Sequence, residues 1–131
     1  MFRMGEAEVR AVERVLMSHQ LFRIGGKFQE VNHFEKEFRE KMKASHCLCL
    51  ASGTGALTAA LAALGIGPGD EVIVPGYTFI ATAIAALSVG AIPVVAEIDE
   101  TMTLNMDDVE RKLSKNTKAV IPVHKIGRAH V

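Results

Sequence analysis

Four small residues in a row, Ser52, Gly53, Thr54 and Gly55, have the composition of a phosphate-binding turn. Small side chains let the backbone approach a ligand closely, and free N–H groups at the start of a helix attract an anion. Thr54 adds a hydroxyl group. From these residues alone, a phosphate-binding turn and an ordinary strand-to-helix turn are equally good interpretations. The segment matches neither GxxxxGK[ST] nor GxGxxG, which disfavours an ATPase or a dinucleotide-dependent enzyme.

Two aromatic residues, Tyr77 and Phe79, follow the apolar run that ends at Pro75. Ligands of open α/β sheets gather at the carboxyl ends of the strands, where aromatic rings can stack on a planar ligand. The alternative is that Phe79 packs its own helix onto the sheet, and the residues alone favour that alternative.

The remaining reactive side chains form weaker patterns. Glu97 and Asp99 follow an apolar run, and a strand end and a turn cap explain them better than an acid–base pair does. His124 is the one histidine near the predicted site, and the five histidines lack metal-ligand spacing, so no metal site is expected. Cys47 and Cys49 are expected to be buried structural thiols.

The elements that position these residues alternate between helix and strand. Apolar residues at helical spacing predict helices, and continuous apolar runs predict strands that are buried on both faces. The predicted helices are 6–18, 31–42, 56–64, 78–89 and 105–113, and the predicted strands are 47–51, 71–75, 92–98 and 119–123. This order predicts an α/β, doubly wound, mostly parallel sheet. The charged cluster Glu35-Lys36-Glu37 is expected to lie on a solvated helix face.

Composition excludes several classes of protein. The 131 residues are 49% hydrophobic and 23% charged, with 15 basic and 15 acidic residues, which is typical of one soluble globular domain. No apolar stretch is long enough for a membrane span, and zero net charge offers no electrostatic basis for binding nucleic acid or a membrane surface. Two cysteines suit a reducing cytoplasm.

A series of short motifs extends along the chain from about residue 4 to 124. They include Leu21-Phe22-Arg23, Gly25-Gly26, Phe34-Glu35, Ser52 to Leu57, Ala62 to Pro75, Tyr77 to Thr82, Pro93-Val94, Asp99, Thr117-Lys118-Ala119 and Ile121 to His124. In this order the set resembles the DegT/StrS-type sugar aminotransferases, which are pyridoxal-phosphate enzymes of fold type I. The resemblance implies the N-terminal part of their three-layer α/β/α large domain, with an incomplete sheet.

The resemblance also implies a site and a reaction. Ser52, Gly53, Thr54 and Gly55 would bind the phosphate of pyridoxal 5′-phosphate, with Thr54 and Gly55 offering N–H groups and a hydroxyl. Phe79 would stack on the pyridine ring, and Tyr77 and His124 would lie at the edge of the site. The substrates would be a nucleotide-linked keto sugar and an amino-acid donor, usually glutamate, in amino-sugar, cell-surface polysaccharide or antibiotic-sugar biosynthesis. The enzymes of this family are cytoplasmic homodimers.

The family's Schiff-base lysine lies beyond residue 124, so no catalytic residue is assigned, and the 131-residue chain is expected to be inactive by itself. We divide the chain into an N-terminal helix and loop (1–30), a partial cofactor-binding domain (31–124) and a tail (125–131). The tail matches a translated sequencing-library adapter and is expected to be non-native. The strand at 47–51 is expected to lack its natural neighbours. The alternatives are a fold type I sugar dehydratase and a non-catalytic α/β module that binds a phosphorylated ligand.

Overall fold

The computed structural model describes residues 4–25 and 28–125 and contains two compact units, residues 1–49 and 50–131. Residues 126–131, which make up nearly all of the predicted non-native tail, lie outside the described residues. The division predicted at residue 30 stays a prediction. None of the helices in the described ranges has the length and apolar content that crossing a membrane requires.

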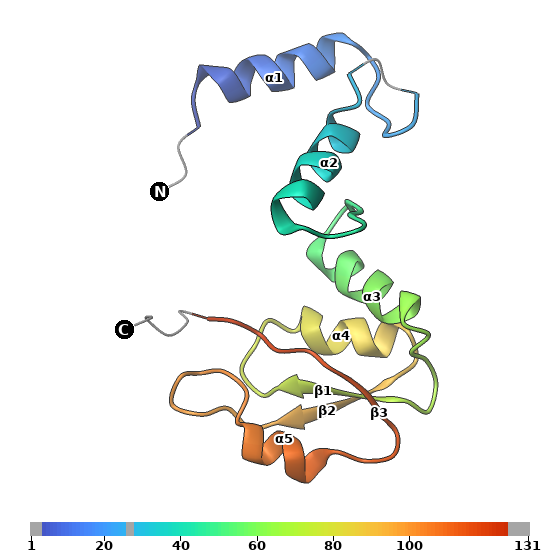
Figure 1. The fold of residues 1–131 in the computed structure, drawn as a ribbon, viewed down its shortest axis with the longest axis vertical. Coiled ribbons are helices and arrows are strands. Elements are labelled where there is room, and N and C mark those ends of the chain that lie inside the picture. Colours follow the sequence, from blue (N-terminus) through green and yellow to red (C-terminus); the bar gives the residue numbers. More distant parts are fainter. Residues whose placement is uncertain (1–3, 26–27, 126–131) are drawn as a thin grey trace. The chain divides into compact units, whose positions relative to one another are not determined.

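The first unit contains two helices, α1 (Glu6–Met17) and α2 (Glu30–Met42), as Figure 1 shows. Both agree with the predicted ranges. At the start of α1 the Glu8 carboxylate accepts a hydrogen bond of 2.7 Å from the Gly5 N–H, which satisfies one of the amide groups that a helix N-terminus leaves free.

Glu35 is the buried residue of α2, with 8% of its surface exposed. Its carboxylate accepts hydrogen bonds from the Cys49 N–H (2.7 Å) and the Arg23 guanidinium (2.6 Å). The Cys49 amide lowers the pKa of Glu35 against the opposing effect of burial, and Arg23 adds to the lowering. The predicted solvated position is therefore wrong for Glu35, although Lys36 and Glu37 are exposed.

The predicted strand at 47–51 is wrong, because these residues form no strand. The Cys49 N–H donates to Glu35 instead of to a neighbouring strand. A strand exists only where another backbone pairs with it, and among the described residues nothing pairs with this segment. Cys47 and Cys49 are free and half-buried rather than fully buried.

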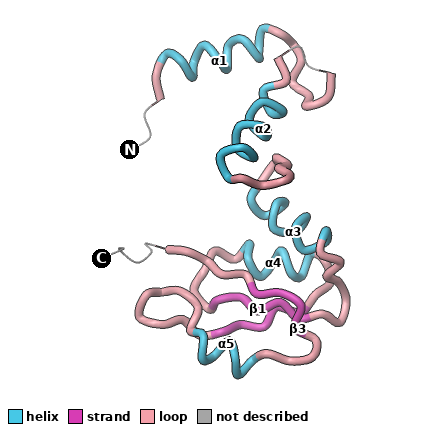
Figure 2. Tube along the Cα trace, viewed as in Figure 1, coloured by secondary structure: helices cyan, strands magenta, loops and turns pink. Residues whose placement is uncertain are grey.

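The second unit is an α/β arrangement, as predicted. Its elements are α3 (Gly53–Ala63), β1 (Glu71–Pro75), α4 (Ala81–Ser88), β2 (Ile92–Ala96), α5 (Met106–Lys112) and β3 (Thr117–Val120). The sheet has the order β2-β1-β3 and both pairings are parallel, with β1 in the middle (Figures 1 and 2). These three parallel strands correspond to the strands predicted at 71–75, 92–98 and 119–123.

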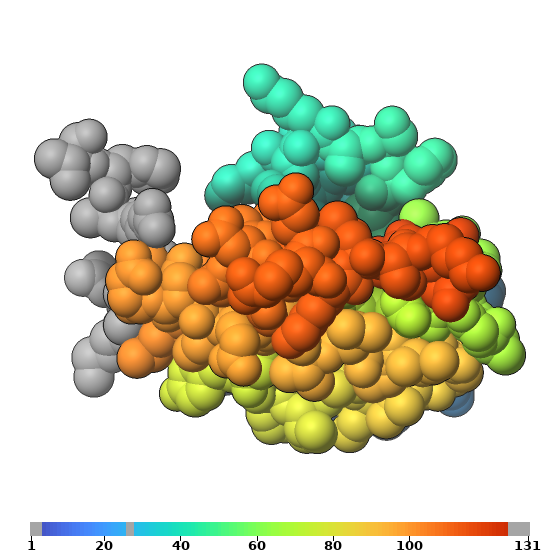
Figure 3. All heavy atoms as spheres, turned by 90° about the horizontal axis from the view of Figure 1, so that it is seen from below, coloured from blue at the N-terminus to red at the C-terminus, as the bar shows by residue number. Residues whose placement is uncertain are grey.

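Helices cover both faces of this sheet. Val72 and Val74 of β1 pack on one face with Leu61 of α3 and Ala85 of α4. Ile73 points to the opposite face, where its cluster consists of Ala96, Leu104 and Val109. Figure 3, seen from below, presents the side of this unit on which the orange atoms of α5 lie. Because successive side chains of a strand alternate between faces, one apolar strand holds the three layers together.

Several element boundaries differ from the predicted ones. Helix α3 begins three residues earlier than predicted because Ser52 caps it, and α4 begins three residues later, at Ala81. Strand β2 ends at Ala96, and β3 lies at 117–120 rather than 119–123. The later start of α4 leaves Thr78 and Phe79 in a loop.

The buried carboxylate of Asp108 ties α5 to the end of β2. It accepts a hydrogen bond of 2.7 Å from the Glu97 N–H and forms ion pairs with Lys112 (2.8 Å) and Arg111 (3.0 Å). Lys112 also donates to the Val95 carbonyl at 2.7 Å. The Glu97 amide first, and then the two basic side chains, lower the pKa of Asp108 to about 2. These bonds determine where the chain leaves β2.

Acid should weaken the second unit through Asp108. A carboxylate whose pKa is about 2 in the folded chain and about 3.9 in the unfolded chain stabilises the fold fully above about pH 4, and this contribution is lost as the pH falls towards 2. Asp108→Asn should lower the midpoint of thermal unfolding at pH 7 and reduce its fall between about pH 4 and 2. Asp107→Asn, at an exposed neighbour, is the control, and equal acid sensitivity of wild type and Asp108→Asn would contradict the assignment.

Candidate functional site

A cleft lies where the chain leaves the carboxyl ends of β1 and β3, beside the N-terminus of α3. Its walls consist of Gly53, Thr54, Ala56 and Leu57 from α3, Thr78, Phe79, Ala81 and Thr82 from the segment after β1, and residues 121–125 after β3. The structure therefore brings together four of the predicted site residues, namely Gly53, Thr54, Phe79 and His124. Ser52 and Gly55 adjoin the lining residues in the chain, and Tyr77 is not among those that line the cleft.

The start of α3 presents two unbonded amide groups to this cleft. The Ser52 side chain caps the helix by accepting the Gly55 N–H at 3.0 Å, and the Ser52 carbonyl accepts the Ala56 N–H at 2.9 Å. Within the described part of the chain, no acceptor bonds the N–H groups of Gly53 and Thr54. Because the N-terminus of a helix carries a partial positive charge, these two amides and the Thr54 hydroxyl suit an anion.

This arrangement refines the roles that the resemblance implies. The Gly55 amide is engaged by Ser52, so the amides available to a ligand are those of Gly53 and Thr54. A Cβ atom on Gly55 would lie 3.3 Å from the Ser52 hydroxyl oxygen, which gives that glycine a role in the cap. A Cβ atom on Gly53 would meet nothing within 4 Å, and its φ lies outside the range that favours glycine. The glycine at position 53 therefore leaves open space directly beside the free amides.

Phe79 forms the aromatic side of the cleft, and 75% of its surface is exposed. The alternative in which Phe79 packs its helix onto the sheet is therefore wrong. Tyr77 is also exposed, and the Lys125 ammonium lies 4.5 Å from its ring centroid. An exposed phenyl ring opposite a helix N-terminus offers a stacking surface for a planar group.

The segment after β3 forms the third wall. The Ile121 N–H donates to the Ile73 carbonyl at 2.9 Å, so pairing with β1 continues beyond the end of β3. This pairing holds residues 122–124 between the cleft and a second hollow, which is also lined by Asp99, Leu104 and Val109. The His124 side chain is exposed.

Glu97 and Asp99 do not join the cleft. Asp99 accepts a hydrogen bond of 2.8 Å from the Thr101 N–H, which is the turn cap that the sequence favours. Glu97 is exposed and contributes its N–H to Asp108. Among the described residues, no group of three or more histidine, cysteine or acidic side chains is placed to hold a metal ion.

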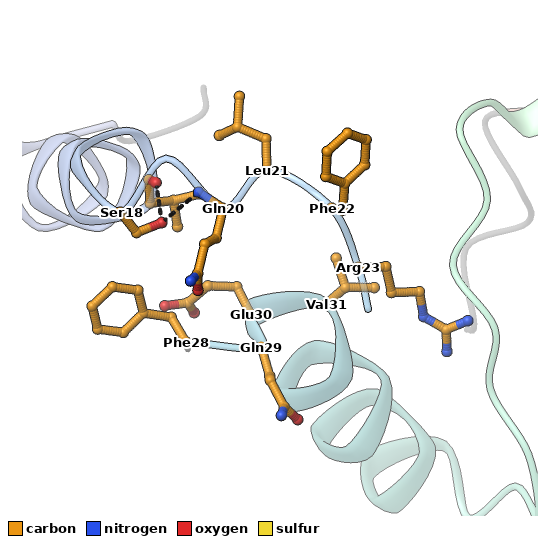
Figure 4. Close-up of a pocket in the computed structure, with 10 residues that line it drawn as sticks. Ser18, Gln20, Leu21, Phe22, Arg23, Phe28, Gln29, Glu30 and Val31 are labelled. Atoms are coloured by element: carbon orange, nitrogen blue, oxygen red, sulfur yellow. Dashed lines mark hydrogen bonds between the residues drawn. The ribbon is translucent and has the colours of Figure 1, made fainter. Parts of the chain in front are cut away.

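A separate pocket lies in the first unit, around the loop between α1 and α2 (Figure 4). Its charged side chains already have partners, because Glu30 pairs with Arg14 and Arg23 pairs with Glu35. Figure 4 shows Leu21 and Phe22 pointing away from Gln29 rather than converging on a common centre. The charged side chains of this pocket are therefore engaged with each other within the first unit.

Two site residues, Thr78 and Thr82, are missed by the sequence analysis. Both line the cleft, and their hydroxyl oxygens lie 2.9 Å apart. The available signal is their spacing of four residues on either side of Phe79. The predicted helix at 78–89 places both threonines at its start, where such a pair does not by itself indicate a site.

Comparisons with known proteins give a family match and similar sequences. Residues 3–130 match the model of the DegT/DnrJ/EryC1/StrS aminotransferase family. GDP-perosamine synthase of Vibrio cholerae is 46% identical over 100 residues, which are 76% of this chain and 27% of that protein.

Solved structures are similar as well. The aminotransferase from Psychrobacter cryohalolentis has a TM-score of 0.88 and 39% identity, over 95% of this chain and 31% of that one. The PLP form of the putative sugar aminotransferase Spr1654 from Streptococcus pneumoniae has a TM-score of 0.80 and 33% identity, over 90% of this chain and 29% of that one. The chain thus spans 27–31% of the length of these relatives.

The two glycines of the turn should respond differently to alanine. Gly53→Ala should raise the free energy of unfolding by ~0.4–1 kcal/mol, because alanine restricts the unfolded chain and meets no neighbour. At Gly55 the same gain should be offset by about 1 kcal/mol, because the added methyl group displaces the Ser52 cap. Thermal unfolding of both variants measures the difference, and equal stabilisation at the two positions would contradict the described cap.

Proposed function

The chain belongs to the DegT/DnrJ/EryC1/StrS aminotransferase family, and we propose that it forms the N-terminal part of a pyridoxal-phosphate-dependent aminotransferase that acts on a nucleotide-linked keto sugar. The observation that carries the proposal is the cleft in which the free amides of Gly53 and Thr54 and the exposed ring of Phe79 line the same space. The GDP-perosamine synthase relative supports the substrate class.

The residues of the cleft fit the cofactor. The phosphate group would accept hydrogen bonds from the Gly53 and Thr54 amides and from the Thr54 hydroxyl, in the space that the missing Cβ of Gly53 leaves open. The pyridine ring would lie against Phe79. Similar chains solved in PLP and PMP forms support this choice of cofactor.

Each wall has its own part in the reaction. Bound pyridoxal phosphate supplies an electron-withdrawing ring, which accepts the electrons released at the reacting carbon. The α3 N-terminus would bind the phosphate and anchor the ring at one end. Phe79 would cover one face of the ring, exclude water from it and fix its plane. His124 lies at the edge of the cleft, where a substrate would enter.

The remaining features of the proposed enzyme follow from the family. Glutamate would be the amino donor, two copies would form a homodimer, and the enzyme would work in the cytoplasm.

Titration calorimetry with pyridoxamine 5′-phosphate tests the proposed site. This form of the cofactor has no aldehyde and cannot react with surface lysines. We expect saturable binding, and we expect Thr54→Ala to weaken it by ~1–2 kcal/mol, which is about five- to thirtyfold, because one hydrogen bond to a charged group is lost.

Unphosphorylated pyridoxamine is the matched control ligand. It should bind more weakly than the phosphorylated form, and Thr54→Ala should not change its affinity. Equal affinity of the wild-type chain for both ligands would remove α3 from the site, and unchanged binding of pyridoxamine 5′-phosphate by Thr54→Ala would remove the Thr54 hydroxyl from it.

A further inference from the structure

The ring of Phe79 is exposed, so its direction must be determined by something other than packing. A phenyl side chain that is 75% exposed has few packing neighbours to hold it. The stacked pair that the structure contains, Phe34 with Phe38, lies in α2 and not at the cleft. The direction of the Phe79 ring must therefore be set by the backbone that carries it.

That backbone is held from both sides by one buried residue. The Thr82 N–H donates to the Phe79 carbonyl at 3.1 Å. The Thr82 hydroxyl lies 2.9 Å from the hydroxyl of Thr78, the residue that precedes Phe79. Thr82 itself is 5% exposed and belongs to the first turn of α4, where its neighbour Ala81 is 9% exposed.

We propose that Thr82 is a positioning residue for the aromatic wall of the cleft: with Thr78 it holds the Phe79 backbone so that the ring stays ready to stack on a planar, phosphorylated heteroaromatic ligand. The inference rests on the proposed function and adds to it a residue that does not stack on the ring itself. The two hydroxyl groups bracket Phe79 because Thr78, in the loop just before it, lies 2.9 Å from Thr82 in the first turn of α4.

A purely structural role predicts a different pattern of effects. A hydroxyl that only stabilises α4 would affect the melting temperature. Its loss would leave the affinity of the folded chain for the ligand unchanged. A hydroxyl that positions Phe79 affects the stacking of Phe79 on the ring of the ligand. It has no effect on the binding of the ligand's phosphate group, which depends on α3. The two roles are therefore separable by ligands that carry different parts of the cofactor.

The experiment compares Thr82→Val, Thr82→Ser and Ser88→Ala in the full 131-residue chain. Valine keeps the shape of threonine without its hydroxyl, and serine keeps the hydroxyl. Ser88, near the other end of α4, donates to the Ile84 carbonyl at 2.8 Å and is the matched loss of a helix hydroxyl. The probes are pyridoxamine 5′-phosphate, followed by calorimetry and by the circular dichroism induced in its absorption band, and inorganic phosphate, followed by phosphorus NMR.

Thr82→Val should weaken the binding of pyridoxamine 5′-phosphate about three- to tenfold, which is the range expected for a lost aromatic contact. The induced circular dichroism at saturation should fall, and inorganic phosphate should bind as in wild type. Thr82→Ser should keep the wild-type affinity for pyridoxamine 5′-phosphate and the wild-type induced circular dichroism. Ser88→Ala should change neither of them. If Thr82→Val does not fold, Thr78→Val removes the same hydroxyl pair from the half-buried side and should give the same pattern.

Phe79→Leu separates the possible failures. If Phe79→Leu weakens the binding of pyridoxamine 5′-phosphate while Thr82→Val and Thr78→Val bind this ligand as the wild type does, the positioning role is overturned and the proposed site stands. If the wild-type chain does not bind pyridoxamine 5′-phosphate, the proposed site fails and the positioning role fails with it.

Discussion

The parallel pairing of β1 with both of its neighbours is the constraint on which the site depends. Pro75 pairs with Ala96, so β1 and β2 end at the same level, and the Ile121 amide extends the pairing of β3 along β1 to Ile73. Val72, Ile73 and Val74 are almost completely buried between the two helical layers. This register directs the chain after β1 and the chain after β3 to one edge, where the N-terminus of α3 also contributes.

The cleft combines backbone segments held by hydrogen bonds with amide groups and an aromatic ring that have no partner within the described residues. Ser52 caps α3 through the Gly55 amide, and this bond leaves the Gly53 and Thr54 amides open. Phe79 is exposed on a loop whose backbone is bonded to buried Thr82. The two amides and the aromatic ring are thus available to a ligand that carries an anionic group and a planar ring. Both features occur in the same cleft, which is the physical basis of the proposal that it binds a phosphorylated aromatic cofactor.

The elements predicted correctly are those whose local pattern determines their structure. The continuous apolar run of β1 and the amphipathic spacing of α1 and α2 identify them without tertiary information. The strand expected at 47–51 failed because a strand needs a paired backbone, which no local pattern reports. Glu35 and Asp108 were missed for a related reason: each is buried because distant amides, those of Cys49 and Glu97, donate to it. In the site, the small residues Ser52 to Gly55 indicated where a helix begins, and their phosphate-binding role stays a prediction. The start of α4 placed Phe79 in a loop and reversed the preferred interpretation of its ring.

Amide chemical shifts during a titration of the 15N-labelled chain with pyridoxamine 5′-phosphate test the central claim most directly. The account predicts saturable shifts of the Gly53 and Thr54 amides, together with those of Thr78 and Phe79, at one common dissociation constant. The Gly55 amide, which Ser52 already bonds, should move less than its two neighbours. Saturable shifts confined to residues outside this cleft, or movement of the α3 amides without that of Phe79, would contradict a single site built from the two walls.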